Sequence, residues 1–272
     1  MITSYNEIIK NYWNEESKRY REAAWERNLI SNYDFIHTKE VLLKSLQPLK
    51  EEKILEIGCG PGLWTDLVAK RCARLTAIDI SEKMIEKAKE NSNQRNISFI
   101  NCDLLDFVTD KKFNKIFSVR VIEYIRDKKK LFKKIRDLLI LNGELIIITK
   151  TRNSLWDFYK RLKRIIKYYN SNCFNEVRQY SWYANPSIKQ MRVLLENNNF
   201  LIINILPVII RLPIFKQGND EIPLISKKFE QLFLKIFNSF SGKISKLPFN
   251  LSFLFAESYL IHAIKAKNKV SN

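Results

Sequence analysis

Three glycines at alternate positions, Gly58, Gly60 and Gly62, follow directly after the apolar run 54–57. Apolar residues at helical spacing come next, so this stretch predicts a strand, a tight turn and a helix. Glycine is favoured where φ is positive or where a ligand must approach the backbone closely. Asp79 ends the following apolar run, where a carboxylate can accept hydrogen bonds from a ribose diol. The spacing therefore predicts a site for a cofactor that carries a nucleoside.

The glycine spacing separates several nucleotide-binding motifs. A dinucleotide fingerprint, G-x-G-x-x-G, needs a glycine at position 63, where the chain has Leu63. A phosphate-binding P-loop needs G-K-[ST], which does not follow here. The G-x-G-x-G form with Glu56 before it resembles the first motif of the class I S-adenosylmethionine-dependent methyltransferases. Four later segments continue this resemblance in the family's order.

The resemblance implies roles for the first two segments. Gly58, Gly60 and Gly62 would form the turn beneath the methionine and ribose parts of S-adenosylmethionine. Glu56 would orient this turn or reach the cofactor amine through water. Asp79 would accept hydrogen bonds from the 2′- and 3′-hydroxyls.

The next two segments would surround the adenine. Ile80-Ser-Glu-Lys-Met84 matches the family's D-[apolar]-S-x-x-M segment once Asp79 is included. By this resemblance Ile80 packs on the adenine face, and Met84 is either a ligand contact or a core residue. Asp103 would accept from the adenine amino group, with the backbone N–H of Leu104 meeting the ring.

Four further residues are candidates near the reacting end of the site. Arg120 follows the fourth apolar run and either pairs with the cofactor carboxylate or is an ordinary loop arginine. The family's histidine is replaced by Tyr124, so an imidazole role at that position is in doubt. Tyr20 lies in an aromatic-rich N-terminal segment that resembles a lid or packs in the core. His37 and Tyr124 are the substrate-side candidates.

No catalytic residue is assigned from the sequence. Methyl transfer from a sulfonium is an in-line displacement, and alignment of the reactants in a dry site can supply the catalysis. A general base is needed only if the acceptor must lose a proton. The four cysteines have no paired metal-ligand spacing, so we expect no metal.

Apolar periodicity alternates between strand and helix, which predicts an α/β fold with a mostly parallel, doubly wound sheet. The strand-like runs are 53–57, 74–79, 97–101, 113–119, 143–149, 200–210 and 256–265. The helical patterns are 5–30, 34–47, 63–72, 81–91, 127–140 and 187–198. The methyltransferase resemblance implies seven strands in this Rossmann-like fold, with the last strand antiparallel between the fifth and sixth.

The chain of 272 residues is long enough for one large domain, and we expect a single methyltransferase domain over 1–272. Residues 1–50 would form an N-terminal helical lid and 51–150 the cofactor-binding core. Segments 151–185 and 211–254 exceed the minimal fold and would form a substrate-side helical cap. The start has no signal-peptide pattern, so we expect a cytoplasmic protein with reduced thiols.

Positive charge is concentrated in the second half of the chain. The net charge is +18, and residues 151–272 hold 19 Lys and Arg against 7 Asp and Glu. Two basic amphipathic patterns, 155–169 and 229–240, suit peripheral contact with an anionic membrane, or they pack as a cap with solvated lysines. The function predicted is methylation of a small or amphiphilic acceptor, such as a lipid-linked or anionic one. Oxygen is the first choice of acceptor atom, and nitrogen and carbon stay open.

Two alternatives stay open at this stage. An RNA methyltransferase would also use the basic surface. However, the chain has no Asn/Asp-Pro-Pro-aromatic motif after the fourth strand and no RNA-binding module, so we expect no nucleic-acid partner. A non-catalytic protein that keeps the cofactor fold is the second alternative. The oligomeric state is not predicted.

Overall fold

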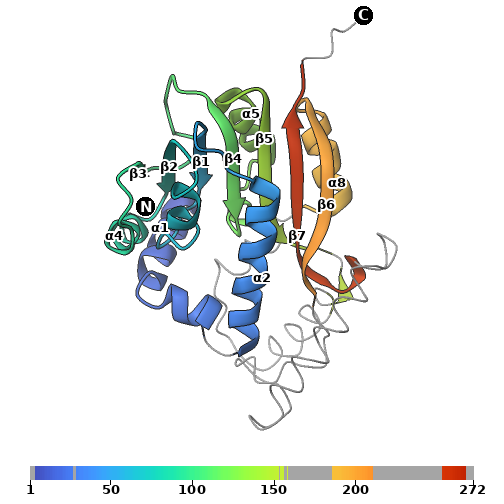
Figure 1. The fold of residues 1–272 in the computed structure, drawn as a ribbon. Helices are drawn as coiled ribbons and strands as arrows, with labels where there is room; N and C mark the ends of the chain where they lie inside the picture. The colour runs from blue at the N-terminus through green and yellow to red at the C-terminus, as the bar shows by residue number, and fades with distance from the viewer. Residues whose placement is uncertain are drawn as a thin grey trace, which may run out of the picture.

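The computed structural model describes residues 4–26, 29–152, 154–155, 158, 186–210 and 253–267. Seven strands form one sheet with the order β3-β2-β1-β4-β5-β7-β6 (Figure 1). Their bounds are β1 Lys53–Ile57, β2 Arg74–Asp79, β3 Ile97–Asn101, β4 Phe113–Val119, β5 Leu139–Lys150, β6 Phe200–Ile210 and β7 Ala256–Lys265.

Strands β1 to β5 pair in parallel, whereas β7 is antiparallel to both of its neighbours, β5 and β6. Ile147 of β5 lies opposite Ile261 of β7, which in turn lies opposite Ile205 of β6. The seven-stranded, mostly parallel fold and the antiparallel last strand are therefore confirmed.

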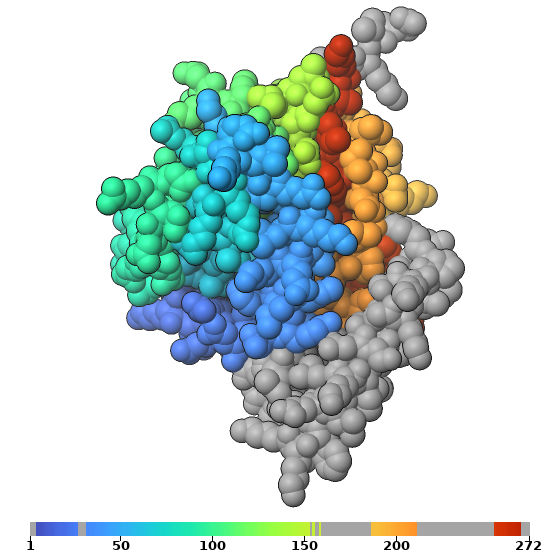
Figure 2. Space-filling model, in the orientation of Figure 1, coloured from blue at the N-terminus to red at the C-terminus, as the bar shows by residue number. Residues whose placement is uncertain are grey.

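Helices cover both faces of this sheet. Figure 1 shows α2 in front of the sheet and α5 and α8 behind it, and Figure 2 shows α2 beside the surface of β6. None of the helices within the described ranges has the length and hydropathy needed to cross a membrane. The helix bounds are α1 Tyr5–Glu16, η1 Glu22–Glu26 (a π-helix), α2 Leu29–Leu46, α3 Thr65–Ala69, α4 Glu82–Asn91, η2 Ile122–Tyr124 (a 3₁₀ turn), α5 Lys128–Leu138 and α8 Ile188–Glu196.

The core is divided by the sheet because successive side chains of a strand point to opposite faces. Leu55 and Ile147 pack on one face with α5 and α8. Their neighbours Ile54 and Ile146 pack on the other face with α2 and α3. The central strands are buried on both faces, as expected for a parallel sheet.

The predicted helix over 5–30 is wrong as a single element. Helix α1 ends at Glu16, a turn and the π-helix follow, and α2 begins at Leu29, before the predicted start at residue 34. The Ser17 hydroxyl donates to the Asn14 carbonyl at 2.7 Å. A side chain that bonds locally to the backbone in this way offers an alternative to helix continuation. The break lets α1 cross the strand ends while α2 runs along the sheet (Figure 1).

Candidate functional site

A cavity of about 280 Å³ lies at the carboxyl ends of β1, β2 and β4, beneath α1. Ligands of open α/β sheets bind at this edge, where the strand order reverses. Nine of the eleven predicted cofactor residues line it, and so does Tyr124. The nine are Tyr20, Gly58, Gly60, Asp79, Ile80, Met84, Asp103, Leu104 and Arg120.

The three glycines of the turn have different surroundings, although φ is positive at each, between +52° and +84°. A Cβ on Gly58 would come within 2.2 Å of Val121. A Cβ on Gly62 would lie 3.2 Å from Ala88, so Gly62 allows α4 to pack closely and does not line the cavity. The nearest atom to a Cβ on Gly60 would be 4.0 Å away, so Gly60 leaves space for a ligand.

Asp79 joins the glycine turn to the end of β2. Its Oδ2 accepts from the backbone N–H of Gly60 at 2.8 Å, and its Oδ1 accepts from the N–H of Ser81 at 2.9 Å. Burial raises the pKa of this carboxyl to about 6, and the two backbone hydrogen bonds oppose that rise. The carboxylate therefore holds the turn in shape and lies at the cavity wall.

Glu56 lies beneath the turn and does not line the cavity. Its side chain is buried, and the Thr65 hydroxyl donates to Oε2 at 2.6 Å. The other oxygen, Oε1, is buried without a hydrogen-bond partner. Burial raises the pKa of Glu56 to about 8, and the nearby Asp79 carboxylate adds to this. The carboxyl is thus mostly protonated at neutral pH.

Asp103 follows β3 and is held at both oxygens. Oδ1 accepts from the backbone N–H of Leu105 at 2.9 Å, and Oδ2 accepts from the side-chain amide of Asn6 at 2.8 Å. Burial raises the pKa of Asp103, and the neighbouring Asp106 raises it further. Asp103, the acid predicted to bind the adenine, is therefore already hydrogen-bonded to Asn6 of α1.

Arg120 has a left-handed backbone, with φ of +64°, which is uncommon for a side chain other than glycine. Its N–H donates to the Ile148 carbonyl at 2.8 Å. Its Nε lies 3.9 Å from the Glu123 carboxylate, which accepts from the Thr149 hydroxyl at 3.0 Å. Arg120 Nη1 is buried without a hydrogen-bond partner. A strained backbone of this kind is frequent at binding sites. The Nη1 N–H groups of Arg120 can donate hydrogen bonds to an anionic group.

An aromatic wall closes the side of the cavity formed by the N-terminal segment. Trp13 makes edge contacts with Tyr20 and Tyr124, with ring centroids 5.7 and 5.2 Å apart. Burial raises the pKa of both tyrosines, so their hydroxyls stay protonated at neutral pH. They can donate hydrogen bonds to a ligand but are poor proton acceptors.

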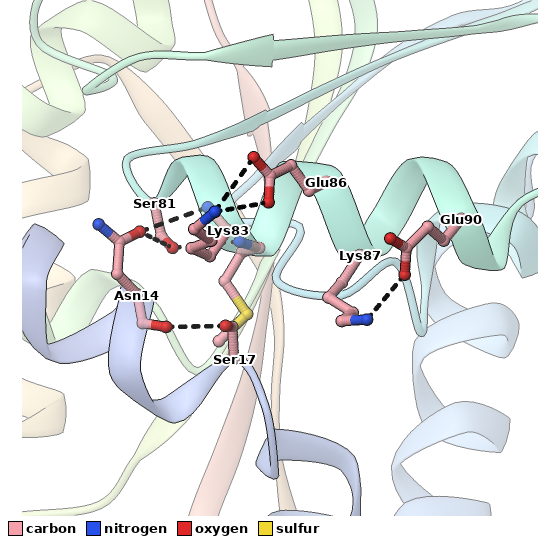
Figure 3. A network of polar contacts seen from close by, with 8 residues as sticks. Asn14, Ser17, Ser81, Lys83, Glu86, Lys87 and Glu90 are labelled. Atoms are coloured by element: carbon pink, nitrogen blue, oxygen red, sulfur yellow. Dashed lines mark hydrogen bonds and ion pairs between the residues drawn. The ribbon is translucent and has the colours of Figure 1, made fainter.

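Polar side chains of α1 bind the loops around the cavity, and Figure 3 shows one of these networks. Asn14 Oδ1 accepts from the Ser81 hydroxyl at 2.7 Å and from the Lys83 N–H at 3.3 Å (Figure 3). The Tyr5 hydroxyl donates to the Tyr124 carbonyl at 3.0 Å. Sequence reasoning missed these contacts because a polar residue on a helix carries no local signal of a partner far along the chain.

The two histidines lie away from the cavity. His37 is on α2 and stacks on Tyr33, with the ring centroids 5.9 Å apart, and burial lowers its pKa. His262 Nε2 lies 2.7 Å from Glu144 between β7 and β5. The structure thus places His37, a predicted substrate-side residue, outside the cavity-lining set.

Comparison with known proteins identifies the domain. Residues 54–143 match the family described as "Methyltransferase domain". The chain carries a class I S-adenosylmethionine-dependent methyltransferase domain. The match begins in β1, includes the glycine turn, and ends within β5.

Relatives of this methyltransferase domain include two bacterial O-methyltransferases. The chain is 31% identical over 159 residues to malonyl-[acyl-carrier protein] O-methyltransferase 1 of Ilyobacter polytropus, which covers 56% of the chain and 58% of that protein. It is 30% identical over 155 residues to the ubiquinone biosynthesis O-methyltransferase of Coxiella burnetii, covering 56% and 62%. The chain therefore spans about three fifths of the length of these relatives.

Solved structures share the fold over a longer stretch. Magnesium protoporphyrin IX methyltransferase from Synechocystis, solved with bound S-adenosylhomocysteine, matches with a TM-score of 0.64 at 15% identity. That match covers 97% of the chain and all of the other chain. The N-methyltransferase NodS from Bradyrhizobium japonicum matches with a TM-score of 0.55 at 18% identity, covering 87% and 98%.

The cavity of this methyltransferase domain fits S-adenosylmethionine in its chemistry. The open space above Gly60 can receive the ligand next to the turn. Asp79 and Asp103 place two carboxylates at the cavity wall, where they can accept hydrogen bonds from hydroxyl or amino groups. The unpartnered, buried Nη1 of Arg120 suits a carboxylate. These donors and acceptors correspond to the polar groups of the cofactor.

Proposed function

We propose that the protein transfers the methyl group of S-adenosylmethionine to an oxygen of a small or amphiphilic acceptor. The observation that carries this proposal is the cavity itself, in which the glycine turn, Asp79, Asp103 and Arg120 come from separate segments to surround one space. S-adenosylmethionine would supply an electrophilic methyl group on a sulfonium.

The chain's own residues would bind and orient the reactants. Asp79 would hold the ribose, Asp103 and the Leu104 N–H the adenine, and Arg120 the carboxylate of the methionine part. Ile80 and Met84 would pack on the ring, and α1 would exclude water from above. Glu56 and Gly62 would act through the shape of the turn, because neither lines the cavity. Such alignment can supply most of the catalysis of a displacement.

The described part of the cavity favours an acceptor that arrives ionised. No histidine is among the described residues that line it, and Tyr20 and Tyr124 have raised pKa values. A carboxylate or an acidic hydroxyl needs no general base, whereas an alcohol or ammonium does. The names of the two relatives, both O-methyltransferases, support oxygen as the acceptor.

The test is methyl transfer to a panel of acceptors with labelled cofactor. We expect transfer to carboxylate-bearing thioesters or phenols, and loss of that transfer in Asp79→Ala. Asp110→Asn is the matched control, because Asp110 is exposed and does not line the cavity. Cofactor binding with transfer only to amines would contradict the oxygen proposal, and no binding of S-adenosylhomocysteine at millimolar concentration would contradict the function itself.

We also propose that residues 1–272 form a single domain and that its basic segments contact an anionic membrane surface. The cap segments 151–185 and 211–254 lie almost wholly outside the described residues. Each Lys or Arg near an anionic surface contributes on the order of 1 kcal/mol to the free energy of membrane binding. With five such residues in one segment, we expect the protein to bind anionic vesicles at low salt. The variant to compare in co-sedimentation changes the following residues to Gln: Lys160, Arg161, Lys163, Arg164 and Lys167. Equal pelleting of the variant, or none by the wild type, would contradict the membrane contact.

A further inference from the structure

Asn6 and Asp103 form a hydrogen-bonded pair at the wall of the cavity. Asn6 comes from the first turn of α1 and Asp103 from the loop after β3, 97 positions later. The Asn6 side-chain N–H donates to Asp103 Oδ2 at 2.8 Å, and both residues line the cavity. Within the described residues, the side-chain carbonyl of Asn6 makes no hydrogen bond.

The donor and acceptor arrangement of this pair is specific. Asp103 Oδ1 is occupied by the Leu105 N–H, while Oδ2 retains lone-pair capacity beside its bond to Asn6. The side-chain carbonyl of Asn6, which also lines the cavity, adds a second acceptor. A six-amino purine carries two N–H donors on one nitrogen, and two acceptors at the cavity wall can satisfy both.

We propose that Asn6 is a specificity-determining residue, which accepts a hydrogen bond from the amino group of the adenine together with Asp103. This inference rests on the proposed function, in which Asp103 meets the adenine. A six-oxo purine would instead place its carbonyl oxygen, an acceptor, against these two acceptors, and the hydrogen bonds to the amino group would be lost.

Asn6 also helps to hold α1 over the cavity. The test must therefore separate recognition of the adenine amino group from closure of α1 over the cavity. Asn14 provides this separation, because it binds the Ser81 hydroxyl and the Lys83 N–H and does not line the cavity. Its loss weakens closure without changing the groups around the adenine. Asn11 is on the same helix and exposed, which makes it the neutral control.

The experiment measures the dissociation constants of S-adenosylhomocysteine and S-inosylhomocysteine by calorimetry on the full chain. The variants are Asn6→Ala, Asn14→Ala and Asn11→Ala. We expect the wild type to prefer the adenine ligand, and Asn6→Ala to reduce the ratio of the two constants by about three- to tenfold, the equivalent of one hydrogen bond. Asn14→Ala should weaken both ligands equally and leave the ratio unchanged, and Asn11→Ala should change neither.

Three results would overturn the inference. An unchanged ratio in Asn6→Ala with both ligands weakened would make Asn6 a lid contact only. An equal change of the ratio in Asn14→Ala would assign the selectivity to closure. Binding of neither ligand by the wild type would remove the proposed function itself, which distinguishes that failure from the first two.

Discussion

Asp79 serves two purposes at once, since it shapes the glycine turn and presents a carboxylate to the cavity. Its two backbone hydrogen bonds favour the charged form, but burial dominates and places the pKa at about 6. In the proposed function this carboxylate accepts hydrogen bonds from a ribose, and protonation would remove part of its capacity to accept them. The site is therefore sensitive to mild acid.

We predict that affinity for S-adenosylhomocysteine falls as the pH drops through about 6, because a growing fraction of Asp79 is then protonated. Calorimetry from pH 5 to pH 8 measures this. Asp79→Ala should weaken binding by about 1–3 kcal/mol at pH 7.5 and flatten the pH dependence, since charged hydrogen bonds are lost. The idea fails if the variant keeps the pH profile of the wild type.

Glu56 gives a second prediction, on stability. Its folded pKa of about 8 lies above the usual value of 4.5, so its contribution to stability is fully present below pH 4.5 and is lost as the pH rises towards 8. The difference in unfolding free energy between wild type and Glu56→Gln should fall with a slope of up to ~1.4 kcal/mol per pH unit across this window. Urea unfolding at pH 5, 6.5 and 8 gives the three differences, and a constant difference would argue against a neutral, buried Glu56.

The glycines of the turn provide a third prediction. Gly60→Ala should weaken cofactor binding with little loss of stability beyond the strain of its positive φ, because the added Cβ enters open space at the cavity. Gly62→Ala should lower the unfolding free energy more, by about 1–3 kcal/mol, since its Cβ would crowd the backbone of Ala88. Thermal melting and calorimetry on both variants separate the two effects. The reverse pattern would contradict the assigned roles.

At the scale of elements, α1 depends on tertiary contacts. It is short, and isolated helices of this length are marginal in water. Asn6, Asn14 and Tyr5 fix it to loops that follow three different strands. The helix is therefore coupled to the edge of the sheet where the cofactor would bind.

We predict that Asn14→Ala loosens α1 without unfolding the sheet. Loss of two hydrogen bonds should cost about 1–2 kcal/mol locally, so amide exchange should become roughly five- to thirtyfold faster in residues 5–16 and stay unchanged in β4 and β5. Hydrogen exchange read by mass spectrometry resolves the segments, with Asn11→Ala as the control. Uniform acceleration across the chain would instead indicate global destabilisation.

Periodicity predicted the strands well because each is a short apolar run with clear boundaries. Six strands keep their predicted ends, and only β5 extends further, to Leu139–Lys150. The break near Ser17 was not predictable, because no glycine or proline marks it. It depends on a local hydroxyl bond and on the packing of Trp25 against Phe35 and Trp64.

The residues of the site, like the elements of the fold, were predictable only in part. Residues at strand ends, such as Asp79 and Asp103, could be placed at the cavity from the strand pattern and the methyltransferase resemblance. Asn6 and Asn14 could not, since their partners lie 97 and 67 positions away. Their role depends on the path of α1, which no local pattern sets.

At the scale of the whole molecule, one buried cation connects elements from both ends of the chain. Lys115 Nζ donates to the carbonyls of Leu46 and Gln47 and lies 3.4 Å from both Glu52 and Glu144. Glu144 in turn contacts His262 of β7. Because Lys115 is buried, these partners depend on it for neutralisation.

We therefore predict that Lys115→Met lowers the unfolding free energy by about 3–5 kcal/mol, because the buried Glu52 loses its cation and the partly exposed Glu144 keeps only His262. Lys53→Met is the matched control, since Lys53 is exposed on the neighbouring strand. Urea denaturation of both variants measures the effect. A loss under about 1 kcal/mol would show that the cluster is hydrated and weakly coupled.

The position of β7 has a consequence for biosynthesis. Although β7 is the last strand in chain order, it lies inside the sheet between β5 and β6 (Figure 1). Until residues 256–265 emerge from the ribosome, the apolar edge of β5 has no permanent neighbour, and β6 has no sheet to join. An unpaired apolar edge is a template for pairing with another chain. The nascent protein is thus most exposed to aggregation in the interval after β6 has been made and before β7 is available.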